Sequence, residues 1–104
     1  MDKPRLDLLK EILEKDPGDT FTKYALGLEY VSLKRYEDAI LVFEDLASNN
    51  PEYHATYYQL GKAYEAAGDF EKARKTYEKG IYVAASQNEM HAKDELQLAL
   101  DELL

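Results

Sequence analysis

Apolar residues recur every three or four positions along most of this chain, which is the period of an amphipathic α-helix. In the first such stretch, Leu6, Leu9, Ile12 and Leu13 form one apolar stripe. The alternating apolar and polar pattern of a β-strand is not found. Clusters of Pro, Gly, Asn and Asp interrupt the helical pattern at residues 16–19, 49–51 and 68–69. The pattern therefore predicts an all-α protein.

Six helices are expected between these breaks, and the short connections imply that successive helices pack antiparallel. Pro4 is expected in the first turn of the first helix, where its missing N–H is not needed. Asp19 and Asn88 are expected to cap the second and sixth helices, and Gly68 to end the fourth. The predicted ranges are 4–15, 20–33, 36–48, 52–67, 70–85 and 89–103.

One set of positions occurs twice in this sequence, and the two copies lie 34 residues apart. A repeat of this length is typical of stacked supersecondary units. The glycine and the alanine of each copy are expected to face each other, so that two helix axes approach to about 8 Å. The first copy is Leu26, Gly27, Tyr30, Tyr36, Ala39 and Phe43, and the second is Leu60, Gly61, Tyr64, Phe70, Ala73 and Tyr77.

The order and period of these residues resemble the tetratricopeptide repeat (TPR) family. The resemblance implies a single all-α domain, a right-handed α-solenoid of antiparallel helix pairs. Its parts would be a leading helix (4–15), a first TPR unit (20–53), a second TPR unit (54–87) and a capping helix (88–104). The chain departs from the pattern at Lys23, where an aromatic residue is usual, at Lys34-Arg35, which replaces a Gly-Asp turn, and at Gln97, in a glycine position.

Composition and charge narrow the classes of partner. The chain has 104 residues, no cysteine and a net charge of −8, which disfavours nucleic acid and acidic lipid surfaces. Its only basic cluster, Lys72, Arg74, Lys75 and Lys79, alternates with Glu71 and Glu78 and is predicted to be a solvated, ion-paired helix face. No apolar run approaches the ~20 residues of a membrane span, and residues 1–4 do not resemble a secretory signal. A cytoplasmic protein is expected.

Catalytic or metal chemistry finds little support in the sequence. His54 and His91 belong to no shared motif, and nothing in the sequence places them together. His91, Asp94 and Glu95 have a metal-compatible spacing on one helix turn, but they are too few for a stable site. We therefore expect no enzyme activity, no cofactor and no metal site.

The resemblance implies a non-enzymatic protein–protein interaction module, an adaptor that binds a peptide segment on a concave face lined by the first helix of each unit. Gln59 stands near a position where carboxylate-binding TPR domains need asparagine, so such binding is not expected here. Packing between neighbouring helices is an equal alternative for some of the face residues. Self-association through Leu98, Leu103 and Leu104, giving a weak homodimer in place of a monomer, is the alternative function. The predicted peptide-binding residues are Phe21, Tyr24, Leu28, Val31, Tyr58, Lys62, Glu65 and Leu98.

Overall fold

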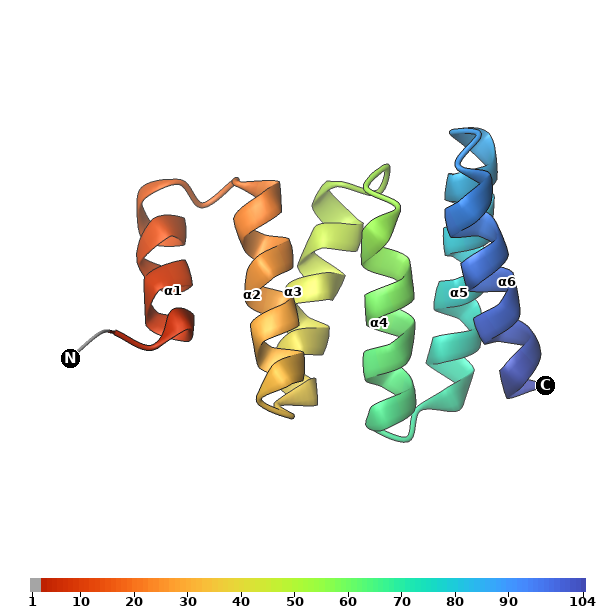
Figure 1. Ribbon diagram of the computed structural model, residues 1–104, viewed down its shortest axis with the longest axis horizontal. Helices are drawn as coiled ribbons and strands as arrows, with labels where there is room; N and C mark the ends of the chain where they lie inside the picture. Colours follow the sequence, from red (N-terminus) through yellow and green to blue (C-terminus); the bar gives the residue numbers. More distant parts are fainter. Residues whose placement is uncertain (1–2) are drawn as a thin grey trace.

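The computed structural model describes residues 3–104, and this part of the chain contains six α-helices and no strand. The helices follow one another from one end of the molecule to the other, so the stack is elongated, with extents of 45 × 28 × 20 Å (Figure 1). The predicted all-α solenoid is therefore confirmed, while Met1 and Asp2, part of the predicted non-signal segment, lie outside the described residues. The helices are α1 (Arg5–Lys15), α2 (Thr20–Ser32), α3 (Tyr36–Asn49), α4 (Ala55–Ala66), α5 (Phe70–Ser86) and α6 (Met90–Leu103).

Three predicted helix ends need correction. Helix α4 begins at Ala55, three residues later than expected, because residues 51–54 form a turn whose Pro51 carbonyl accepts a hydrogen bond of 2.6 Å from the Tyr57 hydroxyl. Pro4 is the extended N-cap of α1 and lies outside its first turn. Asn88 does not cap α6: it has φ 59°, ends the turn after α5, and leaves Glu89 as the N-cap.

The turns inside the two repeat units have the same backbone geometry despite their different sequences. Gly68 has φ 84° and Lys34, its counterpart 34 residues earlier, has φ 60°. In each turn the backbone N–H of the next residue donates to the carbonyl two residues before the end of the helix, Arg35 to Tyr30 at 2.8 Å and Asp69 to Tyr64 at 2.9 Å. These are the bonds of a Schellman motif, which favours glycine at the left-handed position. Lys34 therefore adopts the left-handed conformation that a glycine, Gly68, adopts in the second unit.

Aromatic rings fill the space over the two repeat glycines. A Cβ atom on Gly27 would lie 2.4 Å from Cε1 of Phe43, and one on Gly61 would lie 2.2 Å from Cε1 of Tyr77. The nearest atoms to each glycine therefore belong to these rings and not to the expected partners, Ala39 and Ala73. The reason is that the ring of the second helix, four residues after the alanine, reaches across the crossing and leaves no room for a methyl group.

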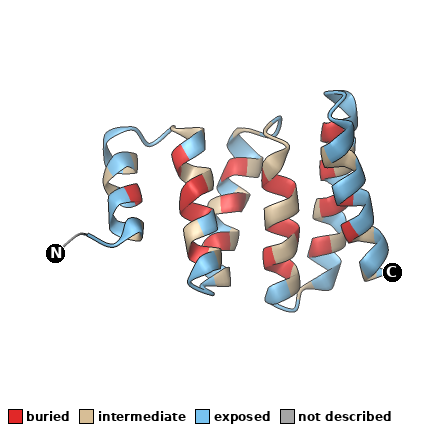
Figure 2. Cartoon of the chain, in the orientation of Figure 1, coloured by how far each residue is buried: buried red, intermediate tan, exposed pale blue. Residues whose placement is uncertain are grey.

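The core runs through the whole stack, and its residues lie on the helix sides that face neighbouring helices (Figure 2). Most large repeat residues are buried, with Phe43 and Tyr77 at 0% exposure, whereas Tyr36 is half-buried and Phe70 is 59% exposed. Gly80 adds a close approach that the repeat pattern did not show, because a Cβ there would lie 2.6 Å from that of Tyr57. The buried large repeat residues are Leu26, Tyr30, Phe43, Leu60, Tyr64 and Tyr77.

The helices form an inner and an outer layer. Helix α4 contacts both α2 and α6, whereas α3 and α5 do not contact each other among the helices described. Helices that touch their next-but-one neighbours lie on the compressed side of a curved stack. The inner, concave side is therefore the side of α2, α4 and α6, and this curvature positions the candidate site.

Candidate functional site

A depression of about 200 Å³ lies where α2, α4 and α6 meet on the inner side of the stack. Helix α2 contributes one tyrosine, the first turn of α4 contributes several polar side chains, and α6 closes the opposite side. The lining is mixed, with aromatic, amide, imidazole and carboxylate groups beside small apolar ones. The lining residues are Tyr24, His54, Ala55, Tyr58, Gln59, His91, Ala92, Glu95 and Leu96.

Two predicted peptide-binding residues, Tyr24 and Tyr58, are brought together by this depression. The Tyr24 ring is half-buried and lies 5.9 Å from the ring of Phe43 and 5.6 Å from that of Tyr53, centroid to centroid, so its position is defined by packing. Burial raises the pKa of the Tyr24 hydroxyl, the Gln59 amide acts in the opposite direction, and the Glu95 carboxylate adds a smaller upward effect. The hydroxyl is therefore a neutral hydrogen-bonding group near neutral pH.

The other predicted residues do not line the depression. Phe21 and Leu98 are 74% and 61% exposed, and Leu28 is 37% exposed. Val31 is partly buried and packs against the core, as the packing alternative expects. Phe21, Leu28 and Leu98 are therefore exposed to solvent, whereas Val31 contributes to the core.

Lys62 and Glu65 are already engaged within the protein. The Lys62 ammonium lies 5.5 Å from the centre of the Tyr58 ring and 3.8 Å from a Glu65 carboxylate oxygen. Glu65 also accepts a hydrogen bond from the buried Tyr77 hydroxyl, which links α5 to α4. A similar bond links the two units, because the Tyr64 hydroxyl on α4 donates to Glu44 on α3. These carboxylates therefore have a structural role at the helix crossings.

The two histidines are closer than the sequence suggested. Both His54 and His91 line the depression, because α4 and α6 are in contact, and the expectation that nothing places them together is wrong. The Nδ1 atom of His54 is buried and has no hydrogen-bond partner within the described part of the chain. Sequence reasoning also missed Glu95 as a pocket residue, although its position one turn after His91 on the same helix was a usable signal. No group of three potential metal ligands occurs among residues 3–104.

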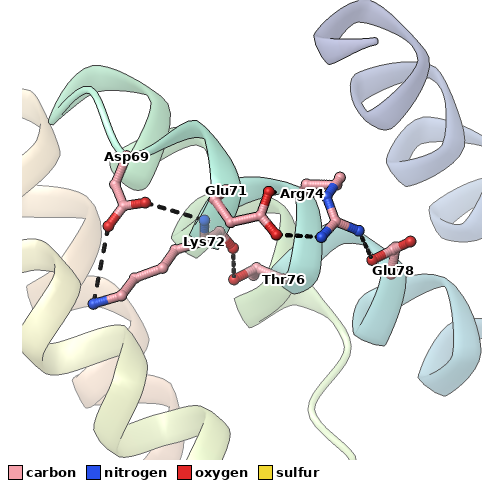
Figure 3. Close-up of polar contacts among 6 residues, drawn as sticks. All are labelled: Asp69, Glu71, Lys72, Arg74, Thr76 and Glu78. Atoms are coloured by element: carbon pink, nitrogen blue, oxygen red, sulfur yellow. Dashed lines mark hydrogen bonds and ion pairs between the residues drawn. The ribbon is translucent and has the colours of Figure 1, made fainter.

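Two of the four residues of the basic cluster on α5, Lys72 and Arg74, form the predicted ion pairs with acidic side chains (Figure 3). Arg74 pairs with Glu71 and, at 2.7 Å, with Glu78. Lys72 lies 3.9 Å from a carboxylate oxygen of Asp69, whose other oxygen accepts from the Lys72 backbone N–H at 3.1 Å. This face therefore presents mixed charge rather than a cationic surface. None of the helices within residues 3–104 combines the length and apolarity needed to cross a bilayer.

The stacked helix pairs, the inner layer and the ring-over-glycine crossings define a helical-repeat protein of the kind that presents a concave surface. The chain belongs to the tetratricopeptide repeat family, whose sequence profile matches residues 24–89. Proteins of this family generally mediate protein–protein interactions.

Several known proteins are similar to this chain. A TPR repeat-containing protein of Pseudomonas aeruginosa, PA0015, is 30% identical over 95 residues, covering 91% of this chain and 90% of that protein. A solution structure of a TPR domain protein from Salinibacter ruber has a TM-score of 0.79 at 38% identity and covers 84% of this chain and 88% of its own. Protein BPP2914 from Bordetella parapertussis, at 24% identity, has a TM-score of 0.86 over 98% of this chain and 89% of its own, and shows the shared fold.

A longer relative contains a similar segment. The tetratricopeptide repeat and J domain-containing co-chaperone DNJ1 of Cryptococcus neoformans is 34% identical over 73 residues, which is 70% of this chain but 14% of that protein. Most of that co-chaperone therefore has no counterpart here.

Proposed function

We propose that this chain binds a peptide segment of a partner protein through the concave face formed by α2, α4 and α6. The observation that carries the proposal is the depression in which Tyr24 and Tyr58 meet, since it joins two aromatic groups to several hydrogen-bonding groups. Tyrosine provides a large contact area and a polar tip with few rotatable bonds, which suits peptide recognition. As part of the same proposal, the protein acts in the cytoplasm as a small adaptor.

Exposed apolar side chains one helical turn from lining residues support a peptide rather than a small molecule as the ligand, since Phe21 lies three residues before Tyr24 and Leu98 three residues after Glu95. Phe21 on α2 and Leu98 on α6 are each more than half exposed, at 74% and 61%. Exposed apolar groups of this size, near a pocket, are typical of interaction surfaces. A bound segment would insert one side chain into the depression while its neighbours cover these two groups.

The proposal is tested by removing the two tyrosines. A phage-displayed library of random 12-residue peptides is panned against the wild type, and the enriched peptides are measured by fluorescence polarisation. The Tyr24→Ala, Tyr58→Ala double variant should bind them at least ten-fold more weakly, because the anchors of the depression are gone. The matched control is Tyr82→Ala, which removes a tyrosine that is 75% exposed on α5 and lies outside the depression.

Two outcomes would contradict the proposal. One is a double variant that keeps its helical circular dichroism and binds the enriched peptides unchanged. The other is a library that yields no peptide sensitive to the tyrosines. A Tyr58→Ala single variant guards against unfolding of the double variant, because Tyr58 makes no aromatic pair with the core rings.

Self-association is a second candidate function, favoured by one observation. Leu98 and Leu104 on and after α6 are 61% and 84% exposed, so this end of the stack presents apolar surface that a second copy would cover. Sedimentation velocity over a concentration series should then show a dimer that the Leu98→Gln, Leu104→Gln variant loses. A wild type that remains monomeric at the highest concentration would remove this candidate.

A further inference from the structure

We propose that the depression between α2, α4 and α6 is a pocket for one cationic side chain of the bound segment, and that an arginine fits it best. This inference rests on the proposed function, because the arginine would belong to the peptide that the concave face binds. Four features of the described residues carry it: the charge of the lining, the aromatic walls, an unpartnered buried nitrogen atom and the size of the cavity.

The first feature is charge. Glu95 is the one carboxylate among the lining residues, which include neither lysine nor arginine. Glu95 is exposed, and it takes part in none of the ion pairs among residues 3–104. Asp94, Asp101 and Glu102 on the same helix, and the net charge of −8, add to a negative field that attracts cations and repels anions.

The second feature is the pair of tyrosine rings. The face of an aromatic ring attracts a cation within about 6 Å of its centre. The Tyr58 ring already holds one cation in this way, since the Lys62 ammonium lies 5.5 Å from its centre. Lys62 is outside the lining, and its charge is balanced by the Glu65 carboxylate at 3.8 Å. A cation entering the pocket would therefore meet a lining that contains two tyrosine side chains, Tyr24 and Tyr58.

The third feature is the buried Nδ1 atom of His54, which has no hydrogen-bond partner among residues 3–104. A buried polar atom without a hydrogen bond is destabilising, and such atoms are rare. In the tautomer that carries its proton on Nε2, Nδ1 is an acceptor. A guanidinium group has five N–H donors, so it could serve the Glu95 carboxylate and, once the His54 ring turns to expose it, this nitrogen atom as well.

The fourth feature is size. The cavity of about 200 Å³ is smaller than the roughly 300–1,000 Å³ of typical small-molecule sites, and suits a single side chain. Arginine is favoured over lysine because its planar group stacks on aromatic rings and forms two parallel hydrogen bonds to a carboxylate. A lysine ammonium would balance the charge of the Glu95 carboxylate but could not form these two parallel hydrogen bonds or stack as a planar group.

The pocket is tested with two probes of nearly equal shape and different charge. The full chain, labelled with ¹⁵N, is titrated with Nα-acetyl-L-arginine N-methylamide and, separately, with the corresponding citrulline compound. The arginine probe should shift the backbone amide signals of residues 55–59 and 91–96 in a saturable way. We expect the citrulline probe, which is neutral, to bind at least ten-fold more weakly.

Two matched variants test whether binding of the arginine probe depends on the Glu95 carboxylate. Glu95→Gln should reduce the affinity for the arginine probe to that of the citrulline probe. Glu102→Gln, which changes another exposed carboxylate of α6 outside the pocket, should leave it within about two-fold of the wild type. Equal binding of the two probes, signal shifts elsewhere, absence of saturable shifts, or an unchanged Glu95→Gln variant would each overturn the inference.

The peptide library separates this inference from the function on which it rests. If the enriched peptides depend on the two tyrosines but contain no basic residue that matters for binding, the cation pocket is wrong and peptide binding stands. If the arginine probe binds in a Glu95-dependent way but no library peptide depends on the tyrosines, the pocket stands and peptide binding fails.

Discussion

The substitution Gly61→Ala tests the helix crossing on which the stack depends. The new Cβ atom would lie 2.2 Å from Cε1 and 2.6 Å from Cζ of the Tyr77 ring. An ordinary contact begins at 3.4 Å, so the ring or the helix must move by more than 1 Å. Tyr77 is fully buried, and its hydroxyl donates to Glu65. The ring therefore cannot turn away without losing that hydrogen bond.

Two opposing effects determine the size of the loss. Adding a methyl group to a well-packed core is destabilising by about 1–3 kcal/mol, and a contact this short belongs at the upper end. The higher helix propensity of alanine offsets about 1 kcal/mol. The free energy of unfolding should therefore fall by about 2 kcal/mol. For a domain of this size the midpoint of thermal unfolding should fall by roughly 8–16 °C.

Urea and thermal unfolding, followed by far-UV circular dichroism, measure both quantities. The control is Gly18→Ala, because a Cβ atom at Gly18 would meet nothing within 4 Å. Its unfolding free energy should change by less than about 0.5 kcal/mol. Combining Gly61→Ala with Tyr77→Leu should cost less than the sum of the two single changes, since the smaller side chain relieves the clash. A Gly61→Ala protein as stable as the wild type would refute the reasoning.

Two further predictions concern the turns and the tyrosines. Lys34→Gly should raise the free energy of unfolding by about 0.5–1 kcal/mol in urea titrations, because Lys34 has φ 60° where its counterpart is Gly68; an unchanged or lower midpoint would contradict this. Burial and the hydrogen bonds to Glu44 and Glu65 raise the pKa of Tyr64 and Tyr77 above that of a free tyrosine. The native state therefore retains these protons above about pH 10, where the unfolded chain loses them, and stability should be complete below that pH and fall above it. Urea midpoints between pH 9 and 11 measure the fall, which should be smaller in the Tyr64→Phe, Tyr77→Phe variant; an equal fall would contradict the assignment.

The repeat positions predicted most of the fold. The offset of 34 residues between Leu26 and Leu60, or between Phe43 and Tyr77, is a property of the sequence, and each pair occupies the same environment in both units. The contacts of individual atoms were less predictable. Spacing along two helices indicates which turns face each other, but whether a ring or a methyl group fills the gap depends on the side-chain rotamer. The ring of Tyr77, not the methyl group of Ala73, therefore lies over Gly61.

The candidate site was only half predictable for a related reason. Tyr24 and Tyr58 are equivalent positions of the two units, so the period alone places them on one face. His54 and His91 are not equivalent positions, and they share a pocket because α4 contacts α6. Asn88 also shows the limit of local signals. Asparagine favours both helix caps and left-handed turns, and the way in which α5 ends placed Asn88 in a left-handed turn.

The sequence by itself was sufficient to establish the helices, their pairing and the family, because the hydrophobic period, the turn residues and the repeat are all properties of the order of residues. The pocket depended on how far the helix pairs rotate against one another. That rotation is the net result of many side-chain contacts, Gly80 against Tyr57 and Leu96 among them, and it brings Tyr24, His54 and Glu95 to a single point.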